Sequence, residues 1–318
     1  MAQVATTRSG FIAIAGRPNV GKSTLANAVV GAKVAIVSDK PQTTRRAIRG
    51  VATSPDWQLV LVDLPGVQRP RDTLTERMQR RVEHELSDAD GCLFVVNAEQ
   101  GIGPGDRFIA ELLRGAPVPV VIAVNKIDRV DRAKTATALK AAADLGVADE
   151  LFPVSARTGS GIRPLVDHLV SLLPEGPFYY EPQQHSDQPQ PVMIAELVRE
   201  QALARTRQEV PHSVEVEVTD VAQPDDARPA QTGEAGGGAR GRRARDDLMR
   251  IQAVILVETD SQKGILIGAA GSMVKAIGTA ARRAIERELG MHVHLELSVR
   301  VRRHWRADER LLDRLGIE

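Results

Sequence analysis

Gly16-Arg-Pro-Asn-Val-Gly-Lys-Ser23 is the stretch that decides the fold of the first part of this chain. It fits the spacing G-x-x-x-x-G-K-[ST], and it stands between an apolar run at residues 11–15 and a helical pattern at residues 22–30. Glycines let the backbone wrap a chain of phosphates with its N–H groups, and the N-terminus of the following helix adds positive potential. The stretch therefore predicts a phosphate-binding loop between a strand and a helix.

The side chains of this loop suit a nucleotide and its metal ion. Lys22 would neutralise the outer phosphates, and the Ser23 hydroxyl would be a ligand of Mg²⁺. A chance glycine turn is the competing interpretation, and further motifs favour the nucleotide. The loop residues expected to bind it are Gly16, Asn19, Val20, Gly21, Lys22, Ser23 and Thr24.

Two polar segments follow in positions that suit the γ-phosphate and the metal ion. Asp63-Leu-Pro-Gly66 comes after the apolar run 58–62, so Asp63 can hold a Mg²⁺-bound water and the backbone N–H of Gly66 can meet the phosphate. The polar segment 38–45 suits a switch, with Thr44 preferred over Thr43 as a further metal ligand; an ordinary polar turn is the alternative. The expected catalytic set is Lys22, Thr44, Asp63 and Gly66.

A base-reading motif ends the apolar run 118–124. In Asn125-Lys-Ile-Asp128, the Asp128 carboxylate can accept from both N–H groups of guanine, which adenine lacks. Asn125 can pair across the base and loop backbone, and the stem of Lys126 can lie along the ring. Ser155-Ala156 follows the run 151–154 and can offer backbone to the guanine carbonyl. These motifs predict a guanine-nucleotide domain.

The length of 318 residues suggests two domains. Apolar runs alternate with amphipathic stretches through residues 1–173, which predicts an α/β P-loop domain with a mostly parallel, doubly wound sheet. A proline-rich linker is expected at 174–191 and an α+β domain at 192–318, with a disordered insertion at about 222–247.

Composition adds few constraints. The net charge of +1 selects no partner, and the single Cys92 lies in an apolar run that predicts a buried strand residue. No apolar run approaches the ~20 residues that span a bilayer. The chain start lacks the pattern of a signal peptide, so a cytoplasmic protein is expected.

The second domain reads helix, strand, strand, G-x-x-G, helix, strand, which is the order of a type II KH fold. Its Gly268-Ala-Ala-Gly271 would let a nucleic-acid backbone approach closely; a plain helix–helix turn is the alternative. Within residues 261–306 nine basic residues face three acidic ones, as expected beside phosphates. The expected RNA contacts are Lys263, Gly268, Ala269, Ala270, Gly271, Lys275, Arg282 and Arg283.

These motifs together resemble the bacterial Era-type GTPases of the TrmE–Era–EngA class, and so does the tail from Val293 through Trp305-x-x-Asp308 to Leu315-Gly. The resemblance implies GTP hydrolysis to GDP with Mg²⁺, binding of the 3′ region of 16S ribosomal RNA, and maturation of the 30S subunit. It also implies a monomer that does not bind DNA. Val67 stands where Ras-like enzymes have a water-orienting glutamine, and the resemblance implies a potassium ion at Asn19 instead.

The sequence departs from the family pattern at Leu64, usually threonine, and at Ala269-Ala270, which lack a lysine often found in that loop. Four arginines in the insertion, Arg240, Arg242, Arg243 and Arg245, suit either an extra RNA contact or a solvated linker.

Two other functions compete with this hypothesis. A membrane-associated regulatory GTPase of cell-cycle or growth control would work at the inner face of the cell membrane. A P-loop metabolic kinase would not need Asn125-Lys-x-Asp128.

Overall fold

The computed structural model describes residues 7–40, 42–67, 72–148, 150–207, 210–222 and 248–317. The chain forms two compact units, one of Met1–Gln188 with Glu309–Glu318 and one of Pro189–Asp308. These boundaries differ from the expected division at residues 173/174 and 191/192, because the proline-rich segment and the last residues both join the first unit. From residue 223 to residue 247, the expected insertion lies outside the described residues, and so does the expectation for residues 1–6 of the chain start.

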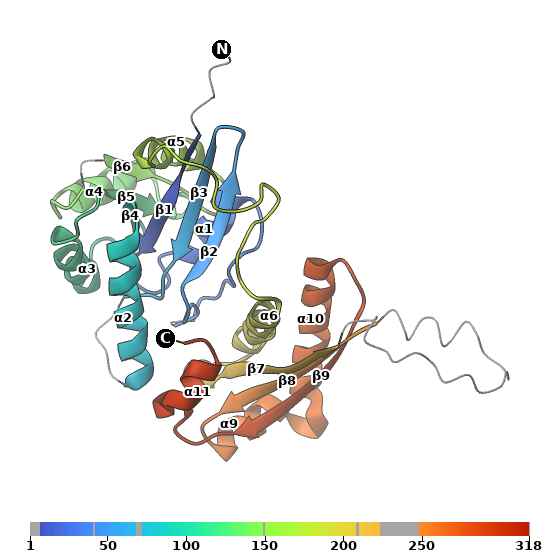
Figure 1. Cartoon of the computed structure of the whole chain (residues 1–318). Helices are drawn as coiled ribbons and strands as arrows, with labels where there is room; N and C mark the ends of the chain where they lie inside the picture. Colours follow the sequence, from blue (N-terminus) through green and yellow to red (C-terminus); the bar gives the residue numbers. More distant parts are fainter. Residues whose placement is uncertain are drawn as a thin grey trace, which may run out of the picture. The chain divides into compact units, whose positions relative to one another are not determined.

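The first unit is built on a six-stranded sheet with the order β2-β3-β1-β4-β5-β6 (Figure 1). All its pairs are parallel except β2–β3, which is antiparallel. The strand order reverses at β1, and ligands of such sheets bind at the carboxyl ends of the strands near the reversal. The strands are β1 (Arg8–Ala15), β2 (Ile48–Thr53), β3 (Trp57–Asp63), β4 (Gly91–Asn97), β5 (Val120–Asn125) and β6 (Glu150–Pro153).

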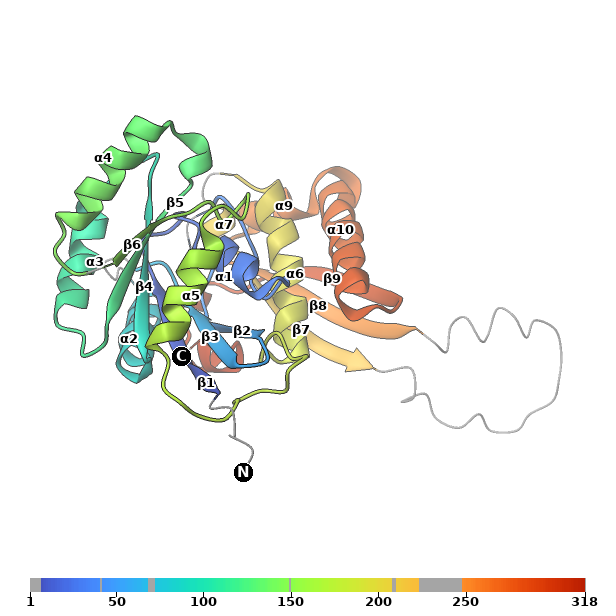
Figure 2. The same ribbon diagram turned by 90° about the horizontal axis from the view of Figure 1, so that it is seen from above.

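Helices cover both faces of this sheet (Figure 2). Alternate residues of each strand face opposite sides, so Ala13 belongs to one core and Ile14 to the other. Cys92 is buried in the first of these cores, and burial raises the pKa of its thiol to about 12. One core packs α2 (Thr73–Asp88), α3 (Pro104–Arg114) and α4 (Arg132–Ala143); the other packs α1 (Lys22–Val30) and α5 (Ile162–Leu172).

The strand β2 was not among the predicted elements. Its sequence, Ile48-Arg-Gly-Val-Ala-Thr53, contains a charge and a glycine and lacks the continuous apolar run of a central parallel strand. It forms because it pairs residue by residue with β3, from Ile48 opposite Asp63 to Thr53 opposite Gln58. A long-range pairing therefore makes this strand, which is why its local pattern is weak.

The second unit is a three-stranded sheet, β7-β8-β9, with all its larger helices in one core. The pair β7–β8 is antiparallel and the pair β8–β9 is parallel. In β9, exposed residues such as His294 and Glu296 alternate with more buried ones, so one sheet face stays open. The elements are α6 (Gln190–Arg205), α7 (Val210–Ser213), β7 (Glu215–Ala222), β8 (Met249–Val257), α9 (Asp260–Ile267), α10 (Ser272–Leu289) and β9 (Val293–Val301).

Among the described residues no single helix is long and apolar enough to cross a membrane. The bent pair Asp260–Ile267 and Ala269–Leu289 passes that test only when its two parts are taken together. Its apolar side chains Leu266, Ile277 and Ile285 are buried in the core of the second unit.

Candidate nucleotide and RNA sites

The loop between β1 and α1 has the backbone of a phosphate cradle. Asn19 and Gly21 have positive φ angles of 64° and 101°. A Cβ on Gly21 would lie 2.4 Å from the Asn125 side-chain nitrogen, so only glycine fits there. The Nζ of Lys22 donates to the carbonyl oxygens of Gly16 and Arg17 at 3.1 Å each. Burial lowers the pKa of Lys22 to about 8, although the nearby Asp63 opposes that shift.

The hydroxyls of Ser23 and Thr44 meet the carboxylate of Asp63 at the start of α1. Ser23 donates to Asp63 Oδ2 at 2.6 Å, and Thr44 Oγ1 lies 3.0 Å from Ser23 Oγ and donates to the same carboxylate oxygen at 3.4 Å. Thr43 instead donates to the Lys40 carbonyl oxygen at 2.6 Å. The geometry thus favours Thr44 over Thr43 at this cluster.

This cluster fits a magnesium ion. Asp63 is fully buried, and its Oδ1 has no hydrogen-bond partner among the described residues. Burial raises the pKa of Asp63, while Lys22 and the hydrogen bonds from Ser23 and Thr44 oppose the shift. Two hydroxyls and one carboxylate are the oxygen ligands that Mg²⁺ prefers.

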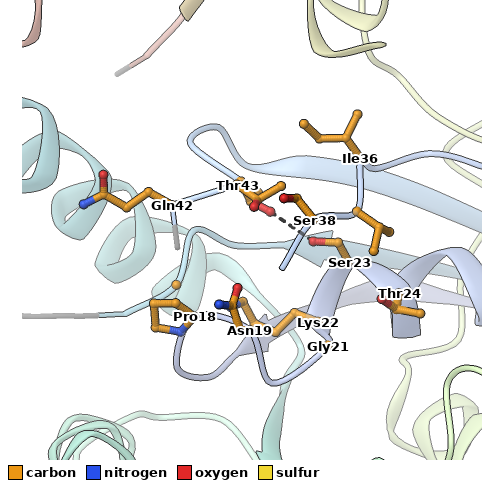
Figure 3. Close-up of a pocket in the computed structure, with 13 residues that line it drawn as sticks. Pro18, Asn19, Gly21, Lys22, Ser23, Thr24, Ile36, Ser38, Gln42 and Thr43 are labelled. Carbon is orange, nitrogen blue, oxygen red and sulfur yellow. Dashed lines mark hydrogen bonds between the residues drawn. The ribbon is translucent and has the colours of Figure 1, made fainter. Parts of the chain in front are cut away.

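The segment after Asp63 lies directly against the phosphate loop. A Cβ on Gly66 would be 2.8–3.0 Å from atoms of Pro18, and the backbone N–H of Val67 donates to the Gly16 carbonyl at 3.2 Å. Gly66, Asn19, Gly21, Lys22 and Ser23 line a cavity with segment residues 36–38 and 42–44 (Figure 3). Its volume of about 50 Å³ suits a phosphate group rather than a whole nucleotide.

Asn125 connects the phosphate loop with the base-reading residues. Its side-chain nitrogen donates to the Val20 carbonyl at 2.9 Å, and its Oδ1 accepts from the backbone N–H of Ala156 at 3.0 Å. Lys126 Nζ donates to the Asn19 carbonyl at 2.6 Å, which lays its stem across the loop. The residues expected at the base are therefore brought together with the phosphate loop.

The carboxylate of Asp128 is oriented by contacts with two neighbouring side chains. Ser155 Oγ donates to its Oδ1 at 2.6 Å, and this bond is the main reason why the pKa of Asp128 is lowered. Its Oδ2 lies 2.8 Å from a guanidinium nitrogen of Arg157. An ionised carboxylate accepts about four hydrogen bonds, so capacity for two base donors is left.

Two arginines at this site were not among the expected residues. Arg157 follows Ser155-Ala156 directly in the sequence, which is the only signal that could have indicated it. Arg17 belongs to the phosphate loop, and its Nε lies 2.7 Å from the buried carboxylate of Asp106 in α3. Asp106 also accepts from the Gly103 backbone N–H at 2.8 Å. The pair fixes the first turn of the loop to α3. No local sequence pattern indicates this pair, because Asp106 lies far from Arg17 along the chain.

The second unit presents the G-x-x-G segment as an exposed turn between α9 and α10. Gly268, Ala270 and Gly271 have positive φ angles of 71°, 49° and 77°. A Cβ on Gly268 would lie 2.8 Å from that of Met273, so this position requires glycine. Ala269 and Ala270 are exposed, which leaves the backbone open to a ligand.

The expected basic residues lie on both sides of this turn. Lys263 is on α9, and Lys275, Arg282 and Arg283 are exposed on α10. Lys275 and Arg283 line a cavity of about 410 Å³ together with Arg205 of α6, whereas Arg282 does not line it. Ile265, which was not expected to contribute, is 48% exposed on α9 and offers an apolar surface to a base.

Comparisons with known proteins match both units. The model of the 50S ribosome-binding GTPase family matches residues 11–126, and that of the KH domain matches residues 240–306. The chain is 45% identical over 312 residues to GTPase Era of Mycobacterium bovis (strain BCG / Pasteur 1173P2), covering 97% of this chain and 98% of that protein. It is 44% identical, with the same coverage, to GTPase Era of Mycolicibacterium smegmatis.

Two solved structures resemble the whole chain. One is a crystal structure of Era in complex with MgGDPNP and nucleotides 1506–1542 of 16S ribosomal RNA, with a TM-score of 0.89 and 33% identity. The other is an Aquifex aeolicus Era variant bound to GDP·AlF4⁻, with a TM-score of 0.87 and 33% identity. Each covers 98% of this chain and 99% of its own. The expected fold class, a mostly parallel P-loop domain followed by a KH domain, is confirmed.

Proposed function

Because the chain belongs to the Era family of GTPases, as its motifs predicted, we propose that it binds the 3′ region of 16S ribosomal RNA and acts in 30S subunit maturation. It is a GTPase that uses a guanine nucleotide and Mg²⁺. In this proposal the nucleotide state of the first unit controls RNA binding by the KH domain.

One observation carries the proposal: the exposed G-x-x-G turn stands in the same chain as a complete set of guanine-nucleotide motifs. The turn has a backbone at positive φ and no large side chain, so a phosphodiester can lie against it. Exposed Lys275, just after the turn, and Arg283, further along α10, supply charge for the flanking phosphates.

We further propose which residues act on the nucleotide. Lys22 pairs with the outer phosphates, and Gly66 offers its N–H to the γ-phosphate. Ser23, Thr44 and Asp63 hold the magnesium ion, Asp63 through a water. When bound, that ion neutralises charge that develops on the phosphates.

The test is a crosslinking experiment in which the full chain, loaded with GTP analogue or GDP, is exposed to cellular RNA and the captured RNA is sequenced. We expect enrichment of the 3′ region of 16S ribosomal RNA, with a yield that depends on the nucleotide. The variant Gly268→Asp with Gly271→Asp should lose this RNA and keep GTP hydrolysis. A matched control, Gly115→Asp with Gly146→Asp, adds the same charges at glycines of the first unit whose Cβ positions are open.

Capture of no ribosomal RNA by the intact chain would refute the proposed function. Equal capture by the glycine variant would show that RNA binds elsewhere on the chain.

The proposal includes a cytoplasmic monomer that does not bind DNA. Light scattering tests the monomer, and competition with duplex DNA tests the preference for RNA. Peripheral membrane association belongs to the second hypothesis, and sedimentation with anionic vesicles tests it.

A further inference from the structure

The last described residues, 309–317, return to the first unit after the chain has completed the second. They form α11 (Glu309–Arg314) and a short extension, here called the tail. Four of its apolar side chains are at most 5% exposed: Leu311, Leu312, Leu315 and Ile317. None of the nucleotide or RNA sites described above uses the tail.

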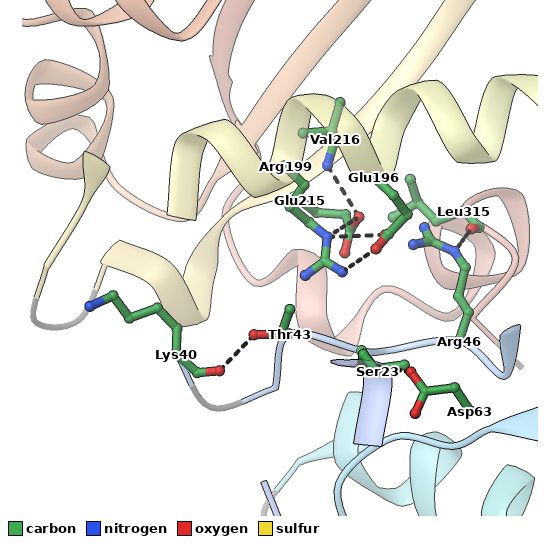
Figure 4. Close-up of polar contacts among 11 residues, drawn as sticks. Ser23, Lys40, Thr43, Arg46, Asp63, Glu196, Arg199, Glu215, Val216 and Leu315 are labelled. Atoms are coloured by element: carbon green, nitrogen blue, oxygen red, sulfur yellow. Dashed lines mark hydrogen bonds and ion pairs between the residues drawn. The ribbon is translucent and has the colours of Figure 1, made fainter. Parts of the chain in front are cut away.

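One contact joins the tail to Arg46, the residue directly after the polar switch segment 38–45. Arg46 Nε donates to the carbonyl oxygen of Leu315 at 2.8 Å (Figure 4). Arg46 is buried and lies two positions after Thr44, whose hydroxyl belongs to the magnesium cluster. Only Arg45 separates Arg46 from Thr44 along the chain.

A second contact joins the tail to α2, the helix that follows the Gly66 segment. Arg77 forms an ion pair with Asp313 at 2.5 Å and donates to the carbonyl oxygen of Ile317 at 3.1 Å. The tail thus contacts Arg46, just after the polar switch segment, and α2, the helix after the Gly66 segment.

The segment that leads into the second unit contacts β2, the strand that begins two residues after Arg46. The backbone N–H of Val51 in β2 donates to the His185 carbonyl at 2.8 Å, and Arg49 pairs with Asp187 at 3.2 Å. Both chain connections therefore contact residues 46–51, which continue directly from Thr44.

The residues directly before the tail are anchored inside the second unit. Trp305 is fully buried and donates through Nε1 to the Ser213 carbonyl at 2.8 Å, and Arg302 pairs with Asp308 at 2.6 Å. Only residues 309–312 separate Asp308 from Asp313, which pairs with Arg77. The covalent link between the two anchored residues is therefore four residues long.

We propose that the tail is a latch that couples the nucleotide state of the switch segment to RNA affinity of the KH unit. This inference rests on the proposed function. In one nucleotide state the Arg46–Leu315 and Arg77–Asp313 contacts hold, and in the other the displaced switch segment strains or releases them. Coupling of this kind is reciprocal, so RNA must change nucleotide affinity by the same factor.

The test measures RNA affinity of the full chain with GTP analogue and with GDP, using an RNA of the 3′ region of 16S ribosomal RNA. In Arg77→Ala and Asp313→Ala the ratio of the two affinities should move toward one by about threefold, a modest change because Asp313 is largely exposed. The double variant should add little to either single change. Because the contacts differ between the two nucleotide states, the ratio of GTP-analogue to GDP affinity without RNA should change by a similar small factor. Guanine selectivity should stay unchanged, since neither residue belongs to the nucleotide site.

The matched control is Arg80→Ala, an exposed arginine of the same helix without a hydrogen bond or ion pair to any described residue. It should keep the wild-type ratio. Hydrogen exchange of the Leu315–Ile317 backbone gives an independent readout and should differ between the two nucleotide states.

Two results would overturn the latch: an unchanged affinity ratio in both variants, or equal exchange of the tail in both nucleotide states. Either is distinct from failure of the proposed function, in which the wild-type chain binds no ribosomal RNA.

Discussion

We propose that nucleotide choice depends on Asp128, the carboxylate that Ser155 and Arg157 contact. Replacing it with asparagine turns one acceptor oxygen into a donor, which opposes the N–H groups of guanine and suits the extra carbonyl of xanthine. We expect Asp128→Asn to weaken GDP binding by about a hundredfold or more, since buried unsatisfied groups cost about 1–3 kcal/mol each. Xanthosine diphosphate should bind to the Asp128→Asn variant more tightly than it binds to the wild type. Calorimetry with both nucleotides checks this.

The control for that change is Asp131→Asn, a few residues further along the chain. Asp131 caps α4 by accepting from the Lys134 backbone N–H at 2.7 Å, and asparagine caps equally well. Unchanged discrimination in Asp128→Asn would mean that another group reads the base.

Asn19 carries the second prediction at this scale. Its side-chain nitrogen lies 2.7 Å from the Asp39 carbonyl oxygen, so the phosphate loop and the polar switch segment meet there. Val67, at the position of a water-orienting glutamine in Ras-like enzymes, is buried and apolar. We therefore propose that K⁺ binds between Asn19 and the switch backbone and aids hydrolysis.

Exchanging K⁺ for Na⁺ at constant ionic strength should slow GTP hydrolysis by about tenfold, one stabilising contact being worth about 1.4 kcal/mol. Asn19→Ala should hydrolyse GTP at similar rates in the two salts. Equal wild-type rates in both salts would reject the ion.

Among the elements, the segment 174–188 is the one whose structure departs most from expectation, because it is fastened to the sheet. Gln58 in β3 is fully buried and uses its whole amide: its oxygen accepts from the backbone N–H groups of Tyr179 and Tyr180, and its nitrogen donates to Tyr180 and Thr53. One side chain thereby fixes the turn of the connecting segment.

Gln58→Ala should lower the free energy of unfolding of the first unit by about 2–4 kcal/mol, because two backbone N–H groups lose their acceptor in a buried place. Urea denaturation followed by fluorescence measures the loss. Gln79→Ala on α2, which removes only an exposed hydrogen bond to Glu83, is the control and should change stability by less than about 0.5 kcal/mol. Equal losses in both variants would show that the buried amide contributes nothing special.

An element could be predicted from the sequence when residues close together along the chain specify it. The phosphate loop, the base-reading motif and the central strands were predictable, because short motifs and continuous apolar runs specify them. The strand β2 was not, since pairing with β3 makes it. Likewise Asp106, which fixes Arg17, lies in a different helix, and no local pattern reveals such a pair. The tail was expected in the second domain because it follows that domain in sequence.

At the scale of the whole molecule, each unit has its own apolar core. Among the described residues, the core of the second unit draws on positions between 193 and 301, and the KH model matches no further than residue 306. Trp305, near the end of that unit, is buried and donates to the Ser213 carbonyl of the same unit. The second unit therefore contains what it needs to fold without the tail.

From this we expect a fragment of residues 189–308 to fold and bind RNA. Extending it to residue 317 should leave its melting temperature unchanged, because the tail packs in the first unit. The extension exposes Leu311, Leu312, Leu315 and Ile317, each worth about 1.5–3 kcal/mol when fully buried, so the longer fragment should self-associate. Calorimetry and light scattering of the two fragments measure both effects.

A rise of several degrees in melting temperature on extension would assign the tail to the KH unit instead, since about 1 kcal/mol shifts the melting temperature of so small a domain by about 4–8 °C. That result would also contradict the latch. The tail would then be held mainly by the core of the KH unit, and its contacts with Arg46 and Arg77 would contribute little.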